Sequence, residues 1–225
     1  MLNEINGHTL IGSELSDQSV VIDLGAHRGA FAHGIVNAFG CRCYAVEANP
    51  VLAAGIPSHP RLSVHNLAIA GANGLVKLHL SNNPEASTIL NKSDHASTDV
   101  AVEALTLPDF VNLVGVNRID VVKFDIEGAE IEALDSCSDD FLKAIPQLTI
   151  EFHDFLGLTP VDVIARRVAR LETLGFFTLK MWRSAWGDTL FVNRHKTNAT
   201  ALQLNYAKWV IANWRRLKSA SSRLA

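Results

Sequence analysis

Cysteine is scarce in this chain, and its placement excludes the roles it usually has in small stable domains. Three cysteines occur among 225 residues, an odd number without Cys-x-x-Cys spacing. This set is not typical of a disulfide framework or of a zinc site, and it favours a reducing compartment. We expect Cys41 and Cys43 to be small core residues of a strand.

Long apolar runs and a strong excess of either charge are also missing. No stretch approaches the roughly 20 apolar residues that a membrane-spanning helix needs. Residues 1–18 lack the basic start and apolar core of a secretory signal, so we expect a cytoplasmic protein. The formal net charge of −3 gives no general attraction to nucleic acid, and we expect no nucleic-acid partner.

The Gly-x-Gly-x-x-Gly fingerprint of dinucleotide-binding folds is absent, although one stretch has the order of elements that usually carries it. Residues 20–22 form a short β-branched run that predicts a buried strand, and Asp23 stands at its carboxyl end. Gly25 and Gly29 then frame a turn, and the apolar spacing of residues 30–39 predicts a helix. Strand, glycine turn and helix form the opening unit of a nucleotide-type α/β fold.

The turn itself reads Asp-x-Gly-x-x-x-Gly. This pattern favours a different ligand from the dinucleotide that the Gly-x-Gly-x-x-Gly fingerprint binds. A carboxylate here would repel a pyrophosphate but attract an ammonium or sulfonium group. S-adenosylmethionine carries both groups and no phosphate, so Asp23 favours this cofactor and weakens the alternative of an NAD-dependent oxidoreductase. A tight turn in which Asp23 only caps the helix is the structural alternative.

The rest of the chain continues as an alternation of strands and helices, which predicts an α/β fold with one Rossmann-like domain and a mostly parallel sheet. We expect this domain over residues 19–195, between a preamble of residues 1–18 and a basic helical tail of residues 196–225. The polar stretch of residues 81–99 is either a substrate-side lid or a surface loop. Further strands are expected over residues 41–46, 61–65, 75–80, 118–124, 145–152, 176–182 and 189–193, the last two as a hairpin.

Polar side chains recur where the predicted strands end, and ligands of open parallel sheets bind along this carboxyl edge. Glu47 follows Asp23 by 24 positions, a spacing typical of the carboxylate that binds a ribose diol, although a solvated strand end is the alternative. Asn66 and the residues after it are expected beside an adenine ring. We therefore predict cofactor contacts from Asp23, Gly25, Ala26, Gly29, Glu47, Asn49, Asn66, Leu67, Ala68 and Asp125.

Methyl transfer from a sulfonium to a hydroxyl needs an oriented nucleophile and a base. His153 is the first candidate base because an unperturbed imidazole titrates near neutrality, and Asp125 is the second. A histidine that merely bonds to a neighbour is an equally open interpretation. Glu127 and Glu151 add carboxylates to this region, but no spacing rule fixes a cation site, and we assign no metal. Glu130 is expected on the solvated face of the following helix.

Four blocks of sequence stand out together. They read Ile-Asp-Leu-Gly-Ala-His-Arg-Gly at residues 22–29, Glu-Ala-Asn-Pro at 47–50, Val-Lys-Phe-Asp-Ile-Glu-Gly-Ala-Glu at 122–130 and Ile-Glu-Phe-His at 150–153. Over about residues 20–155 the chain resembles the FkbM family of S-adenosylmethionine-dependent methyltransferases, with Asp-x-Glu-Gly-Ala-Glu as the most specific element. The resemblance implies a seven-stranded Rossmann-like sheet with a terminal antiparallel strand, and O-methylation of a sugar, glycolipid or natural-product hydroxyl.

The last part of the chain is basic. No acidic residue follows Asp188, whereas Leu204, Ala207 and Ile211 recur at helical spacing. This pattern predicts a helix that either contacts an anionic membrane surface peripherally or packs on the domain or on another subunit. The alternative to an enzyme is a non-catalytic glycan- or lipid-binding module that keeps the fold, and the oligomeric state stays open.

Overall fold

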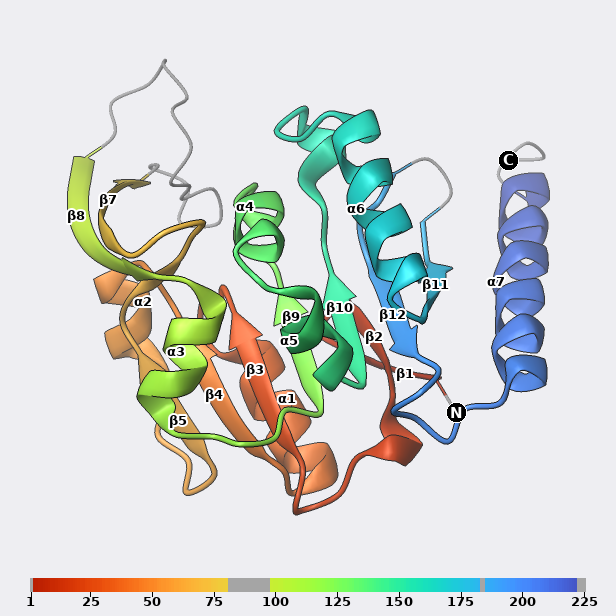
Figure 1. Ribbon diagram of the computed structural model, residues 1–225, viewed down its shortest axis with the longest axis horizontal. Helices are drawn as coiled ribbons and strands as arrows, with labels where there is room; N and C mark the ends of the chain where they lie inside the picture. Colours follow the sequence, from red (N-terminus) through yellow and green to blue (C-terminus); the bar gives the residue numbers. More distant parts are fainter. Residues whose placement is uncertain (1, 81–97, 183–184, 222–225) are drawn as a thin grey trace.

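A seven-stranded sheet forms the centre of the computed structural model, which describes residues 2–80, 98–182 and 185–221 (Figure 1). All pairings within this sheet are parallel except the two that β12 makes with β10 and β11. The predicted fold, a mostly parallel sheet with an antiparallel C-terminal hairpin strand, is therefore confirmed. The spatial order is β11 (Phe176–Lys180), β12 (Thr189–Asn193), β10 (Gln147–Ile150), β9 (Val121–Phe124), β3 (Val20–Leu24), β4 (Arg42–Val46) and β5 (Leu62–His65).

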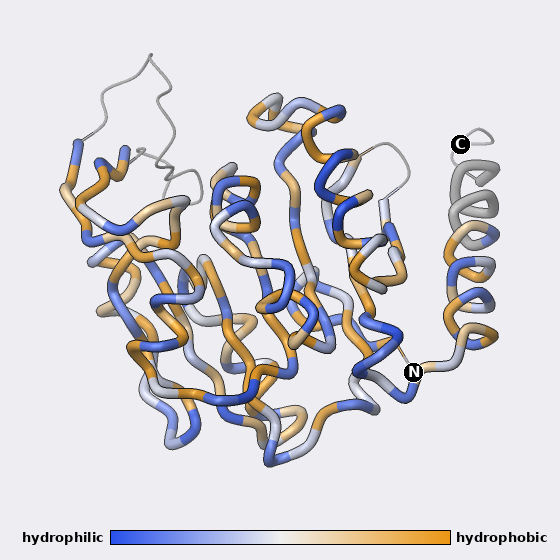
Figure 2. The backbone as a smooth tube through the Cα atoms, viewed as in Figure 1, coloured by the Kyte–Doolittle hydropathy of each residue, from blue (hydrophilic) through white to orange (hydrophobic). Residues whose placement is uncertain are grey.

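Helices cover both faces of the sheet because successive strand residues point to opposite sides. Ile22 and Leu24 pack with α3, α4, α5 and α6 on one face, whereas Val21 packs with α1 on the other. Cys41 and Cys43 are fully buried on the α1 side, as predicted. Figure 2 shows the strands as largely hydrophobic. The helices are α1 (Ala30–Phe39), α2 (Pro50–Gly55), α3 (Leu107–Val114), α4 (Glu130–Asp135), α5 (Asp139–Ala144), α6 (Val161–Thr173) and α7 (Ala201–Ser221).

The first residues form a β-hairpin, β1 (Leu2–Ile5) and β2 (His8–Ile11), with a left-handed turn at Asn6 and Gly7. The Ile11 backbone N–H donates to Gln147 Oε1 of β10 at 2.7 Å. The Thr9 backbone N–H donates to Asp188 Oδ1 at 3.0 Å. These bonds hold the hairpin against the sheet and bring His8 to the end of β9. A 3₁₀ turn (Gly12–Glu14) then leads to β3.

A second, three-stranded sheet flanks the carboxyl ends of the central strands. Its order is β6 (Ala68–Ile69), β8 (Thr98–Leu105) and β7 (Gly74–Leu80), with β7 antiparallel to β8. The sequence predicted the strand over residues 75–80 but not this separate sheet. The proposed lid falls almost entirely on residues 81–97, which lie outside the described part of the chain.

The C-terminal helix α7 lies beside the hairpin end of the sheet (Figure 1). Leu204 is buried and packs, with Ala207 and Ile211, in a cluster that includes residues of β11 and β12. This packing agrees with the helical spacing seen in the sequence. Within the described ranges, none of the helices is both long enough and apolar enough to cross a bilayer. The side chains of residues 214–221 and the whole of residues 222–225, which include most of the predicted basic residues of α7, lie outside the description.

Candidate active site

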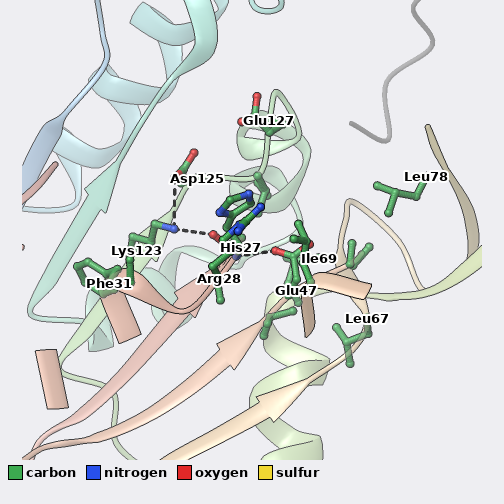
Figure 3. Close-up of a pocket in the computed structure, with 18 of the residues that line it drawn as sticks. His27, Arg28, Phe31, Glu47, Leu67, Ile69, Leu78, Lys123, Asp125 and Glu127 are labelled. Carbon is green, nitrogen blue, oxygen red and sulfur yellow. Dashed lines mark hydrogen bonds and ion pairs between the residues drawn. The ribbon is translucent and has the colours of Figure 1, made fainter. Parts of the chain in front are cut away.

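A cavity of about 700 Å³ opens at the carboxyl ends of β3, β4 and β9 (Figure 3). Its volume lies within the range of small-molecule and cofactor sites. The position agrees with the rule that open α/β sheets bind ligands beyond the carboxyl ends of their strands. Its walls come from the β3–α1 turn, the end of β4, the start of the small sheet and the β9–α4 turn.

The β3–α1 turn depends on the absence of a side chain at Gly25. This residue has φ of +78°, and a Cβ there would lie 1.7 Å from the backbone oxygen of Asp125. Its N–H and that of Ala26 both donate to Val46 O at 2.9 Å. Gly29, also with φ of +78°, begins α1 as its N-cap. The glycine pattern thus lets the ends of β3, β4 and β9 approach closely, with Gly25 and Ala26 on the cavity wall.

The buried side chain of Lys123 contacts three groups at this edge of the sheet. Its Nζ lies 3.0 Å from Asp23 Oδ1 and 3.3 Å from Asp125 Oδ2, and it donates to Gly25 O at 2.7 Å. Burial lowers the pKa of Lys123, but the two carboxylates outweigh burial and raise it. Burial likewise raises the pKa of Asp125, but Lys123 and His8 outweigh that effect and lower it. The ammonium therefore compensates two carboxylates. Asp125 lines the cavity, whereas Asp23 is fully buried beneath it.

Glu47 presents its carboxylate at the end of β4 on the cavity wall. Its Oε2 accepts from the His27 backbone N–H at 2.7 Å, and its Oε1 accepts from the Asn49 backbone N–H at 2.8 Å. Burial raises the pKa of this carboxyl group. Two backbone donors orient both oxygens, and each oxygen keeps a lone pair for a ligand hydroxyl.

The two predicted asparagines support this wall and do not line the cavity. Asn49 caps α2, because its side chain accepts from the backbone N–H groups of residues 51 and 52. The Asn66 side chain donates to the backbone oxygens of Glu47 and Ala48 at 2.8 and 3.0 Å. Leu67 and Ala68 do line the cavity and give it an apolar side.

A second group of polar side chains gathers around His153, which begins the 3₁₀ turn His153–Leu156 after β10. Its Nε2 lies 3.5 Å from Asp125 Oδ1 and 3.5 Å from Glu127 Oε2, and its Nδ1 lies 3.0 Å from Glu130 Oε1. Burial lowers the pKa of His153, but Glu130 and the other carboxylates outweigh burial and raise it to about 9. Burial is the main cause that raises the pKa of Glu127 to about 7.

Three residues of this edge were not identified from the sequence. The prediction that Glu130 is solvated is wrong: it is fully buried because the β9–α4 turn folds it inward toward His153. The sequence did contain an indication of Lys123, because it is the single charged residue inside an apolar strand. It contained no indication of His8, because the position of His8 depends on how the N-terminal hairpin packs. Its Nε2 lies 3.5 Å from Asp125 Oδ2.

A sequence model of the methyltransferase FkbM domain matches residues 23–176, a range that begins at Asp23 and covers most of the chain. This chain belongs to the FkbM methyltransferase family. The resemblance noted from the four sequence blocks is confirmed, and so is S-adenosylmethionine, the methyl donor of this family. No curated protein sequence matches this FkbM methyltransferase.

Several solved structures are similar at low sequence identity. Precorrin-6y C5,15-methyltransferase from Geobacter metallireducens shares 13% identity, with 79% of each chain covered and a TM-score of 0.43. TrmK of M. capricolum, in complex with S-adenosylhomocysteine, shares 11% identity over 86% of this chain and 71% of that chain, with a TM-score of 0.46. Fibrillarin of Aeropyrum pernix, with bound S-adenosylmethionine, shares 12% identity over 81% and 69%, with a TM-score of 0.46.

The cavity of this FkbM methyltransferase fits the cofactor in size and in chemistry. Glu47 offers an oriented carboxylate for a ribose diol, and Leu67, Ala68 and Ile69 offer an apolar wall for an adenine ring. Asp125 places negative charge on the wall for an ammonium or sulfonium group. The residues predicted as contacts that line this one cavity are Gly25, Ala26, Glu47, Leu67, Ala68 and Asp125, whereas Asp23, Gly29, Asn49 and Asn66 do not line it.

Proposed function

We propose that this methyltransferase acts on a hydroxyl oxygen of a sugar, glycolipid or natural product. The supporting observation is the group of carboxylates around His153, which meets the cofactor cavity at Asp125 and Glu127. A hydroxyl is a weak nucleophile until its proton is drawn away, so such a group is useful beside it.

The chemistry needs little from the protein beyond placement and charge. When bound, S-adenosylmethionine supplies a methyl group whose bond to sulfur breaks, with its electron pair staying on sulfur, as a bond to the acceptor oxygen forms. Glu47 and the β3–α1 turn hold the donor side of the cavity in one position. One group on the acceptor side, His153 in its neutral form or Asp125, receives the proton that the hydroxyl loses. Because the carboxylates raise the pKa of His153 to about 9, transfer that uses this base should become faster as the pH rises toward that value.

The test separates cofactor binding from transfer. Calorimetric titration with S-adenosylmethionine, with NAD as the control ligand, measures binding. Glu47→Gln should weaken it about 10- to 100-fold, the worth of charge-assisted hydrogen bonds. Labelled methyl transfer is then measured with panels of hydroxyl and amine acceptors, and ¹³C NMR of the product distinguishes methyl ethers from N-methyl groups.

Each outcome points in one direction. Ether products that disappear in His153→Gln, while cofactor binding persists, support the proposal. Products methylated only at nitrogen or carbon contradict the choice of oxygen. A folded protein that binds glycans or lipids but not the cofactor would favour the non-catalytic binding module.

A further inference from the structure

Three side chains place atoms that can ligate a metal close together, and two of them, Asp125 and Glu127, line the cavity. Asp125 and Glu127 come from the β9–α4 turn, and His153 comes from the 3₁₀ turn after β10. Each offers one ligand atom, and these atoms lie within 4.8 Å of one another. Figure 3 shows Asp125 and Glu127 at the same end of the cavity.

The distances suit a shared ion better than direct pairing. His153 Nε2 is 3.5 Å from each of the two facing carboxylate oxygens. Charge-assisted hydrogen bonds are shorter, at about 2.7–2.9 Å. Ligands held about 2.1 Å from one ion lie about 3.0–3.4 Å apart in octahedral or tetrahedral geometry, close to the 3.5 Å that separates Nε2 from each carboxylate oxygen.

The support behind His153 is the independent observation. Glu130 is fully buried, and its Oε1 already accepts from the backbone N–H groups of Ile126 and Gly128, at 3.0 and 3.2 Å. The same oxygen lies 3.0 Å from His153 Nδ1, so Nδ1 is the donor of this pair. With Nδ1 bonded to Glu130, Nε2 is the nitrogen that faces Asp125 and Glu127, and its lone pair becomes available to a cation that displaces its proton. Carboxylate–histidine pairs of this kind stand behind metal ligands in proteins.

A neighbouring group is less suitable. His8, Asp125 and Glu151 also place ligand atoms within 4.8 Å of one another. However, Asp125 faces His8 with Oδ2, the oxygen that lies 3.3 Å from the Lys123 ammonium. A cation there would be repelled by Lys123, whereas Asp125 Oδ1 faces His153.

We propose that Asp125, Glu127 and His153 bind one divalent cation of the Mn²⁺ class. Two carboxylates and one imidazole combine the ligands that suit Mn²⁺ with one that Mg²⁺ seldom takes. Three protein ligands leave coordination positions open, as in catalytic metal sites. Provided that the proposed function holds, an acceptor hydroxyl takes one of these positions and coordination lowers its pKa. The ion then replaces His153 and Asp125 as the group that activates the hydroxyl, because it occupies their lone pairs, and the proton passes to solvent water. The acceptor class is then a compound with adjacent oxygens that can chelate the ion.

Direct Mn²⁺ binding tests the site without any acceptor. The protein is stripped with a chelator, dialysed and titrated with MnCl₂, and the free ion is followed by electron paramagnetic resonance. We expect one ion per chain. Glu127→Gln should weaken binding at least 10-fold, since it removes a partly exposed ligand. Glu130→Gln should also weaken it, by about 10- to 100-fold, as supporting residues do. The matched control is Glu132→Gln, an exposed carboxylate on the same helix, which should bind as the unchanged protein does.

Folding and function are checked in the same samples. Circular dichroism and S-adenosylmethionine titration establish that each variant is folded. A folded protein that binds the cofactor but no stoichiometric Mn²⁺ overturns the metal site and leaves the proposed function intact. Equal Mn²⁺ affinity in Glu127→Gln and Glu132→Gln overturns it as well. Stoichiometric Mn²⁺ binding without any O-methyl product contradicts the proposed function and leaves the site standing.

Discussion

Replacing Lys123 with methionine should destabilise the protein strongly, because it removes the counter-charge of two carboxylates. Lys123 is 3% exposed, and Asp23, 3.0 Å away, is completely buried. Removing one partner of a buried ion pair typically costs about 3–5 kcal/mol, since the other charge stays in a medium of low dielectric constant. For a domain with a typical unfolding free energy of about 5–15 kcal/mol, this is a large fraction of the total.

The partner substitutions should be unequal in cost. Asp23→Asn leaves Lys123 with Asp125 and with the Gly25 carbonyl, so we expect a loss of only about 1–2 kcal/mol. In the double variant the buried charge of Asp23 and its cation are both gone. Its cost should therefore be lower than that of Lys123→Met alone, because neutral replacements of a buried pair are often tolerated.

Urea unfolding followed by circular dichroism, at pH 7.5 and without cofactor, measures these free energies. The control is Lys143→Met. Lys143 pairs with Asp140 at 3.4 Å, but the two side chains are 50% and 95% exposed, and such surface pairs contribute at most about 1 kcal/mol. The reasoning is refuted if Lys123→Met costs no more than this control, or if the costs of the two single changes simply add in the double variant.

Three further predictions follow from the same structure. Gly25→Ala should cost at least about 3 kcal/mol in urea unfolding, because its Cβ would meet a backbone oxygen at 1.7 Å, whereas Gly7→Ala, with positive φ but open space, should cost about 1–2 kcal/mol. Burial raises the pKa of Glu47, so its carboxylate becomes protonated at a higher pH than usual. Calorimetry should therefore show that cofactor affinity falls as the pH is lowered, and Glu47→Gln should abolish that pH dependence. Trp209 is 61% exposed on α7, and we expect Trp209→Ser to reduce co-sedimentation with anionic vesicles, while equal binding would contradict a membrane role for this face.

Much of the site was predictable because parallel sheets impose a strong rule. The apolar runs located the strands, and the rule that ligands bind at their carboxyl ends brought Glu47 and Asp125 to the same edge. Both line the cavity. Asn49 and Asn66 were also placed at this edge, but their side chains bond to the local backbone and support the wall. Sequence position indicates which edge a residue occupies, and it does not indicate whether the side chain faces the ligand or the neighbouring strand.

The sequence by itself determined the order of the elements. Runs of β-branched residues, helical spacing and glycines that permit positive φ are local properties, and they predicted the strand, turn and helix of the cofactor edge. Only the tertiary structure decided which charges meet. Lys123 reaches Asp23 because β9 pairs with β3 in one register, and Glu130 supports His153 because the turn after β9 folds beside the end of β10. Contacts between groups far apart in the chain depend on that packing, so no local pattern carries them.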